Sequence, residues 1–479
     1  MPNRFLRAVA ALSLCVSLSA CGLIVTEGPG SGPGQAPSTT GAGATTEPPY
    51  TAPARPDAAA RAEAGLSALP EADFGGLSFI VATAGYDPLF PAEGERIDDR
   101  AKLARNAAVS ERYNVSFIPA ASTVDAIYSE TLAAETSGLY YADLLILPAS
   151  QVGRFAAAGL LRNLHNLPFW DNTTVAYGAT ASAGGANRTT YADLGAAVLD
   201  HDRLPAIFFN RTLAESLGYD LYGAVESGEW TWELYLQAAA DAAFLDGVWG
   251  HTVYPADENI YSDLCAGSFG LSLLQQTEGS APVLTVPEGI ERIDTLLRSL
   301  RSETARYPGD PENVLAPLQS FSGGSLLFCT ADLEYMDWLY DAPTKWGILP
   351  LPGNGDGNYH SPTGADAPVL CVTAANNKFE QTGLILAALN AASTDVITDA
   401  YITERLQNRL RDWESAGMIQ RIAETAVYDL PTLYASGMTS LGNATIAAVR
   451  EAAAGGAPLS TIVTNRAYYA NLELSRLFG

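Results

Sequence analysis

Apolar segments typical of strands alternate with amphipathic helical stretches from about residue 73 to the end of the chain. Strands are predicted at 77–83, 115–118, 143–147, 206–209 and 369–373, with a further strand-rich block at 325–349. Helices are predicted at 96–113, 124–132, 212–217, 232–244 and 288–301. Because strand and helix alternate, we expect an α/β chain whose parallel sheets are covered on both faces, divided between two lobes.

A basic and then apolar segment opens the chain, with Arg4 and Arg7 ahead of an apolar run from Ala8 to Leu18. This pattern predicts a secretory signal whose apolar run is too short to span a bilayer comfortably. The following Cys21, placed after Leu-Ser-Ala, resembles the lipobox of bacterial lipoproteins, which implies removal of residues 1–20 and lipidation of Cys21. We expect residues 21–72, rich in Gly, Pro, Ser and Thr, to be a disordered tether. The alternative is an ordinary signal peptide followed by a chance cysteine.

The charge of the chain narrows the classes of ligand. The formal net charge is −26, and so acidic a surface repels phosphate backbones, so we expect no nucleic-acid partner. Basic residues are few near the loops predicted below to form the site, which favours a neutral ligand over an anion. Beyond the predicted tether the chain has an odd number of cysteines, Cys265, Cys329 and Cys371, and we expect buried free thiols.

A series of short motifs follows in a fixed order along the chain. They are Arg105–Val115, Tyr141–Leu145, Ala158–Leu161 with Asn166–Pro168, Ile207–Asn210 with Leu213–Glu215, Gly228–Glu233, Lys345–Pro352, Arg411–Ser415 and Val427–Leu430. Over about residues 73–479 these motifs resemble the extracellular solute-binding proteins of ABC importers, in the large group that includes sugar-binding lipoproteins. No single motif is diagnostic, and it is their order that carries the resemblance.

That resemblance implies a periplasmic-binding-protein-like fold, with two α/β lobes joined by crossing hinge strands and a ligand cleft between them. Lobe 1 is expected at 73–205 with a return segment near 368–400, and lobe 2 at 206–367 with C-terminal helices 401–479 packing across the lobes. The implied function is capture of a small ligand, a carbohydrate, by hinge closure and its delivery to the membrane subunits of an ABC importer. We expect a monomer held through Cys21 on the extracellular face of the cell membrane.

Other functions stay open on the sequence alone. One is binding of a peptide or another polar solute, or a sensor role without transport; the other, from a different class, is a cell-surface carbohydrate hydrolase. Asp332 and Glu334 lie two residues apart, but a glycosidase needs two carboxylates across a cleft, which a sequence does not establish. The four histidines have no zinc-site spacing, and no phosphate-binding glycine motif occurs. We therefore predict no catalytic residue, no metal and no cofactor.

Loops at the carboxyl ends of the sheet strands are expected to line the cleft. Sugar sites combine aromatic faces with acids and amides that take the hydroxyl groups. The candidate ligand-binding residues are Tyr86, Asp87, Ser150, Asp200, Trp230, Glu334, Tyr335 and Tyr359. A structural role competes for several of them, namely a turn for Tyr86 and Asp87, core packing for Trp230 and Tyr335, and a loop tip for Tyr359.

Overall fold

The computed structural model describes residues 58–91, 94–170, 185–186, 189–254, 258–275, 281–301, 305–310, 312–410 and 412–479. The predicted signal segment, the lipidation site Cys21 and the tether up to residue 57 lie outside these residues. None of the helices formed by the described residues is both long and apolar enough to span a bilayer.

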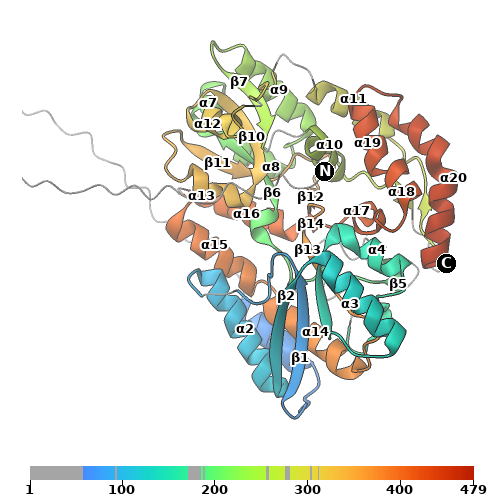
Figure 1. Cartoon of the computed structure of the whole chain (residues 1–479). Helices are drawn as coiled ribbons and strands as arrows, with labels where there is room; N and C mark the ends of the chain where they lie inside the picture. Colours follow the sequence, from blue (N-terminus) through green and yellow to red (C-terminus); the bar gives the residue numbers. More distant parts are fainter. Residues whose placement is uncertain are drawn as a thin grey trace, which may run out of the picture. The chain divides into compact units, whose positions relative to one another are not determined.

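In the first of two four-stranded sheets, apolar clusters cover both faces of the inner strands, while the edge strand β2 (Val115–Ser122) is largely exposed. The order of this sheet is β13 (Pro368–Cys371), β3 (Leu144–Pro148), β1 (Leu77–Ala84) and β2, with only β13 antiparallel to its neighbour. Phe79 and Val81 belong to one apolar cluster and Ala82 and Ala84 to another, because successive strand residues point to opposite faces. The covering helices are α2 (Ile97–Tyr113), α3 (Val124–Ser137), α4 (Val152–Ala157) and α14 (Phe379–Ser393) (Figure 1).

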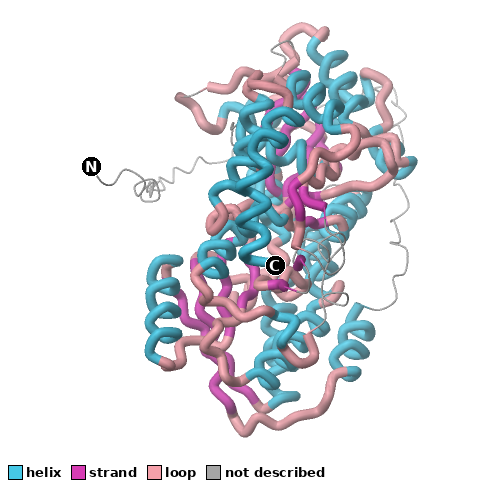
Figure 2. Tube along the Cα trace, turned by 90° about the vertical axis from the view of Figure 1, so that its right-hand side faces the viewer, coloured by secondary structure: helices cyan, strands magenta, loops and turns pink. Residues whose placement is uncertain are grey.

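The second sheet has the order β11 (Trp346–Leu349), β6 (Pro205–Asn210), β10 (Leu326–Asp332) and β7 (Trp249–Val253). Here β10 runs parallel to β7 and antiparallel to β6, so the sheet is mixed. Strand β6 is buried along its whole length. The surrounding helices are α7 (Arg211–Ser216), α8 (Leu221–Ser227), α9 (Trp232–Ala243), α12 (Ala316–Ser322), α13 (Met336–Leu339) and α16 (Trp413–Glu424). Figure 2 shows the two groups of strands apart from each other, with helices around both.

Further helices lie in the part of the chain that the structure describes. They are α10 (Glu258–Ser268), α11 (Ile290–Leu300), α15 (Val396–Asn408), α17 (Leu430–Tyr434), α18 (Thr439–Ala444), α19 (Ile446–Ala453) and α20 (Leu459–Phe478). Three two-stranded pairs complete the sheets: β4 (Gly185–Ala186) with β5 (Thr189–Thr190), β8 (Leu274–Gln275) with β9 (Val283–Leu284), and β12 (Ser361–Pro362) with β14 (Ala426–Val427).

Most predicted elements are confirmed, with one informative difference at Pro119. The strand predicted to end before Pro119 continues to Ser122. β2 lies at the edge of its sheet, where a residue without an N–H donor is tolerated because one side of the strand pairs with no neighbour. The prediction of free, buried thiols is also confirmed for Cys265, Cys329 and Cys371.

The predicted tether is wrong over its last part, because residues Ala58–Ala68 form helix α1. Leu66 and Leu69 pack against the apolar cluster of the first sheet, and Arg61 forms an ion pair of 2.7 Å with Asp395. The Leu69 carbonyl also accepts a hydrogen bond from Arg112. Alanine-rich composition favours the helix intrinsically, but these long-range contacts are what hold it in place, and a local reading of the sequence does not reveal them.

An ion network ties the first sheet's helices to the second sheet. Asp202 lies just before β6 and pairs with Arg96, which precedes α2, at 2.7 Å, and with Arg405 on α15. Arg405 reaches on to Asp337 on α13 at 2.6 Å, and the Tyr401 hydroxyl donates to Asp202 at 2.9 Å. Burial alone raises the pKa of Asp202, but Arg405 and Arg96 outweigh it and hold that pKa at about 2.

Replacing Asp202 by asparagine should lower the free energy of unfolding by about 3 kcal/mol, because it leaves the buried Arg405 guanidinium without its closest charge partner. Glu226→Gln is the matched control, since it breaks the exposed Arg421–Glu226 pair and should cost less than about 1 kcal/mol. Urea unfolding of both variants measures the difference. Equal losses would mean that the network contributes no more than a surface pair.

Candidate functional site

Polar side chains gather at one edge of the second sheet. Because β6 is antiparallel to β10, the start of β6 and the end of β10 meet there, with Pro205 opposite Asp332. The 3₁₀ turn η3 (His201–Arg203) precedes β6, and η4 (Leu333–Tyr335) follows β10. A hydrogen bond from the Leu333 N–H to the Leu204 carbonyl, at 3.0 Å, joins the two turns. This edge therefore brings together residues that are far apart in the sequence.

Two carboxyl groups at this edge have pKa values well above the ordinary value for aspartate. Burial, followed by the Glu334 carboxylate, raises the pKa of Asp332 to about 7, against the opposing effect of Arg203. Burial, followed by the Asp202 carboxylate, raises the pKa of Asp200 to about 6. Asp200 is also among the charges that raise the pKa of Asp332, so the two carboxyl groups lie within each other's field. The site is thus an acidic cluster in which Arg203 is a positive charge near both groups.

Two tyrosines form an aromatic corner beside these acids. Tyr254 follows β7, which runs parallel to β10, and its N–H donates to the Thr330 carbonyl at 2.7 Å. The rings of Tyr254 and Tyr335 meet edge to face, with centroids 4.7 Å apart. Burial and then Tyr254 raise the pKa of Tyr335 to about 12. The Tyr335 phenol therefore stays protonated at neutral pH and can donate as well as accept hydrogen bonds.

The first sheet contributes Tyr86, which follows β1. Its ring is 51% exposed. Partial burial and then the carboxylates of Asp200 and Asp202 raise the pKa of its phenol, which places Tyr86 within the field of the polar edge of the second sheet. Of the predicted residues, Asp200, Glu334 and Tyr335 thus lie at the polar edge of the second sheet, and Tyr86, after a strand of the first sheet, lies within the field of Asp200.

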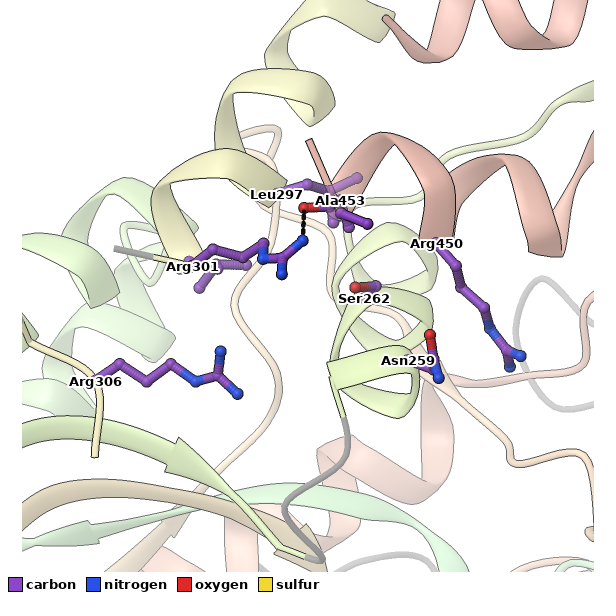
Figure 3. A pocket seen from close by; sticks show the side chains of 9 residues that line it. Asn259, Ser262, Leu297, Arg301, Arg306, Arg450 and Ala453 are labelled. Carbon is purple, nitrogen blue, oxygen red and sulfur yellow. Dashed lines mark hydrogen bonds between the residues drawn. The ribbon is translucent and has the colours of Figure 1, made fainter. Parts of the chain in front are cut away.

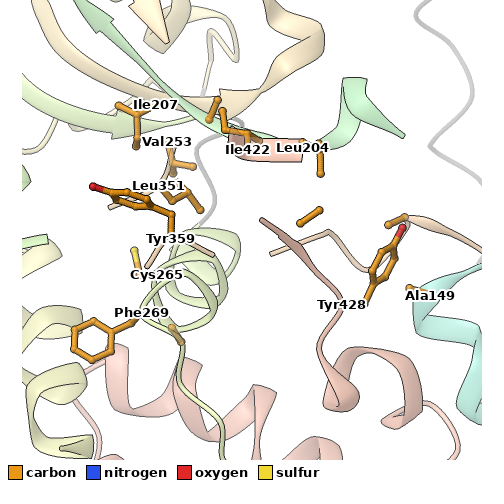
Figure 4. Packing of buried hydrophobic residues seen from close by; sticks show 14 of the residues in the cluster. Ala149, Leu204, Ile207, Val253, Cys265, Phe269, Leu351, Tyr359, Ile422 and Tyr428 are labelled. Atoms are coloured by element: carbon orange, nitrogen blue, oxygen red, sulfur yellow. The ribbon is translucent and has the colours of Figure 1, made fainter. Parts of the chain in front are cut away.

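Two of the predicted aromatic residues lie in the core instead. Trp230 is fully buried, packs against Phe328 and donates its indole N–H to the Pro350 carbonyl at 2.8 Å. Tyr359 is 5% exposed and donates its hydroxyl to the Val225 carbonyl at 3.1 Å. Figure 4 shows Tyr359 among apolar side chains, next to Leu351. The prediction that these two rings face a ligand is wrong for this structure, because their polar atoms are already satisfied inside the protein.

Asp87 and Ser150 have local roles in their loops. The Asp87 carboxylate accepts from the Leu89 and Phe90 N–H groups and from the Thr83 hydroxyl, so it holds the turn after β1. Ser150 is half-buried in the turn after β3, where its N–H donates to the Ala365 carbonyl at 2.9 Å. Both residues shape the edge of the first sheet, and their contact with a ligand stays a prediction.

Tyr254 was not among the candidate residues predicted from the sequence. The preceding strand β7, Trp-Gly-His-Thr-Val, was not predicted, although its β-branched and aromatic residues carry a weak strand signal. In the part of the chain that the structure describes, no group of three or more His, Cys, Asp or Glu side chains is arranged to hold a metal ion.

Comparisons with known proteins give a fold but no sequence match. No family model matches the chain, and no curated protein matches it in sequence. Among solved structures, the cyclic α-maltosyl-1,6-maltose-binding protein of Arthrobacter globiformis is 16% identical with a TM-score of 0.53, over 84% of this chain and 100% of that one. The galacto-N-biose-/lacto-N-biose I-binding protein of a Bifidobacterium longum ABC transporter is 13% identical with a TM-score of 0.52, over 85% of this chain and 98% of that one.

The GacH receptor of Streptomyces glaucescens, solved without ligand and with acarbose, is 15% identical with a TM-score of 0.51, over 84% of this chain and 100% of that one. This chain has the fold of ABC-transporter solute-binding proteins. The two-lobed α/β fold expected from the order of sequence motifs is therefore confirmed. In the solute-binding-protein fold of this chain, the polar edge described above joins the end of β10 to the segment that enters β6.

Asp332→Asn should raise stability at pH 8 and flatten its pH dependence. Because the pKa of Asp332 is raised on folding, its contribution is fully present below pH 4 and is lost as pH rises through about 7. The gain at pH 8 should be on the order of 2 kcal/mol, given about 1.4 kcal/mol per pKa unit and partial screening. Unfolding midpoints between pH 4 and 8 measure it, with the exposed Asp246→Asn as control. An unchanged pH profile in D332N would contradict the assignment.

Proposed function

We propose that this protein is an extracellular solute-binding protein that captures a small carbohydrate and delivers it to an ABC importer. The observation that supports the proposal is the polar edge formed by Asp200, Glu334 and Tyr335, with Tyr86, from the end of a first-sheet strand, within the field of Asp200. A ligand held by residues of both sheets contacts all of them only when the lobes are closed, so its binding shifts the population towards the closed form.

The composition of the edge supports a polyhydroxylated ligand. Carboxylates accept hydrogen bonds from sugar hydroxyl groups, and Tyr254, Tyr335 and Tyr86 offer both aromatic surface and phenol groups. The similar solved structures add to this support, since those proteins bind cyclic α-maltosyl-1,6-maltose, lacto-N-biose and acarbose. We propose a neutral mono- or oligosaccharide, because the edge holds more carboxyl groups than cations.

The protein should be stabilised by one class of neutral sugar. Thermal unfolding with glucose, maltotetraose, lactose, a tripeptide and single amino acids tests this on the purified full chain. A ligand at a hundred times its dissociation constant should add about 2.7 kcal/mol. A saturable shift with sugars alone supports the proposal, and a shift with peptides alone overturns the ligand class. Release of a new sugar product in the same mixtures would instead establish a hydrolase.

Tyr86→Ala should weaken the binding of the sugar found in this way about tenfold, since a lost aromatic contact costs about 1.4 kcal/mol. The matched control is Tyr468→Ala, which removes another exposed tyrosine on α20. Titration calorimetry of both variants separates the two cases. Unchanged affinity in Y86A, with an unfolding midpoint like that of the parent protein, would remove Tyr86 from the site.

We propose that Cys21 carries lipid and holds the protein on the outer face of the cell membrane. Expression in a bacterium fed a labelled fatty acid should give a labelled, membrane-bound protein, and Cys21→Ser should give an unlabelled one. Cys15→Ser is the control, because Cys15 lies inside the predicted signal. Label retained in C21S would show that the cysteine following Leu-Ser-Ala is not the lipidated residue.

A further inference from the structure

The cavity among α10, α11 and α19 is too small for a sugar. Its volume is about 40 Å³, which is room for about three water molecules at about 10–15 Å³ each. Two of its arginines join elements of the protein: Arg301 donates to the Ala453 carbonyl at 2.6 Å, marked by the dashed line in Figure 3, and Arg450 pairs with Asp263. A carbohydrate needs a more open surface, such as the polar edge of the second sheet.

The turn that follows β10 has an inner and an outer face. The 3₁₀ turn η4 runs without a break into the short helix α13. Leu333, Met336 and Leu339 are fully buried and define the inner face. Residues four apart on a helix lie on one side of it, with Cβ atoms about 5–6 Å apart, so Trp338 shares the outer face with Glu334. One more aromatic side chain therefore stands beside the acid predicted to bind ligand.

The indole of Trp338 is open to a ligand. Trp338 is 39% exposed, whereas Tyr335 on the same turn packs against the larger apolar cluster. Among the described residues its N–H finds no hydrogen-bond acceptor, while the indoles of Trp230 and Trp346 donate to backbone carbonyls. An exposed indole offers an apolar face and an available donor together. A sugar ring, with an apolar face and hydroxyl groups at its rim, is complementary to that combination.

Trp338 also lies close to the junction with the first sheet. Asp337, the residue before it, pairs with Arg405 at 2.6 Å, and Arg405 in turn pairs with Asp202. Asp202 pairs with Arg96, which precedes α2 of the first sheet. The aromatic corner formed by the two tyrosines occupies the other flank of the turn. The outer face of the turn therefore lies between the ion network and the aromatic corner, in continuity with the candidate site.

We propose that Trp338 forms an outer subsite for a second sugar ring, so that the site selects an oligosaccharide over a monosaccharide. This inference rests on the sugar-binding function proposed above. When one ring is held by Glu334 and Tyr335, the indole of Trp338, one helical turn further along, contacts the next ring of the ligand. A monosaccharide ends before it reaches the indole, so Trp338 adds affinity only for the longer ligand.

Titration calorimetry of the full chain tests this by comparing glucose with maltose and maltotetraose, and galactose with lactose. Trp338→Ala should weaken binding of the preferred longer sugar about tenfold and change monosaccharide affinity less than about twofold, because only the longer sugar contacts the indole. Trp413→Ala is the matched control and should bind like the parent. Trp413 is 42% exposed on α16, but the preceding Asp412 pairs with Arg211, which follows β6 at the opposite edge of the sheet.

Each outcome decides the proposal. Loss of the preference for the longer sugar in W338A, but not in W413A, supports the subsite. Equal weakening of short and long sugars in W338A, or no weakening, overturns the subsite and leaves sugar binding itself in place. A parent protein that binds a monosaccharide as tightly as its longer forms overturns it too. If none of these sugars binds the parent protein, the proposed sugar-binding function fails and the subsite fails with it.

A second variant separates the subsite from a loss of folding. Trp338→Phe keeps an aromatic face and should retain most of the preference for the longer sugar, which a merely structural role of the indole would not predict. Urea midpoints of W338A, W338F and W413A should match that of the parent protein, because these rings are exposed. A preference lost equally in W338F and W338A would overturn stacking as the origin of the selectivity.

Discussion

The pairing of Asp202 with Arg96 and Arg405 is the constraint on which the arrangement of the site depends. This one carboxylate, just before β6, fixes the position of two other segments. The first is the segment before α2, which follows the loop of Tyr86, and the second is α15, which follows α14 of the first sheet. The polar edge therefore lies next to the Asp202 carboxylate, whose charge is already paired with two arginines of the protein. A movement of one sheet relative to the other that keeps these ion pairs intact costs less free energy than one that breaks them. The network therefore limits the relative positions that the two sheets readily adopt.

Neighbouring acids at this edge behave in opposite ways because of where the cations lie. Asp202 and Asp200 are two residues apart, yet the pKa of the first is lowered and that of the second is raised. Both acids are buried, but Arg96 and Arg405 pair directly with Asp202, whereas at Asp200 burial and the Asp202 carboxylate outweigh the effects of Lys102 and Arg203. With few basic residues in the chain, their placement decides which acids are structural and which remain available for a hydroxyl group of a ligand.

The order of strands and helices could be predicted because both faces of the first sheet are apolar and the repeats of strand and helix differ. Part of the site followed from that order: Tyr86 and Glu334 were found by asking what comes after a strand. The predictions for Trp230, beside a helix start, and Tyr359, between two strands, failed because burial of a ring depends on distant partners such as Phe328 and Val225. Helix α1 escaped prediction for the same reason, since Arg61 finds its partner at Asp395. A single sequence does not reveal which distant segments pair with each other.

The position of β13 has a consequence for how the chain acquires its structure. Leu147 of β3 pairs with Val369 of β13, and the whole second sheet lies between them in the sequence. The first sheet therefore stays incomplete, with an edge of β3 open, until the chain up to β13 has been made and has folded back. Closing so long a loop is entropically costly and slow, whereas β6, β7, β10 and β11 come from one continuous stretch of chain. The second sheet is thus the one that should form first as the chain folds, and until β13 arrives the unpaired edge of β3 is the surface most exposed to mispairing.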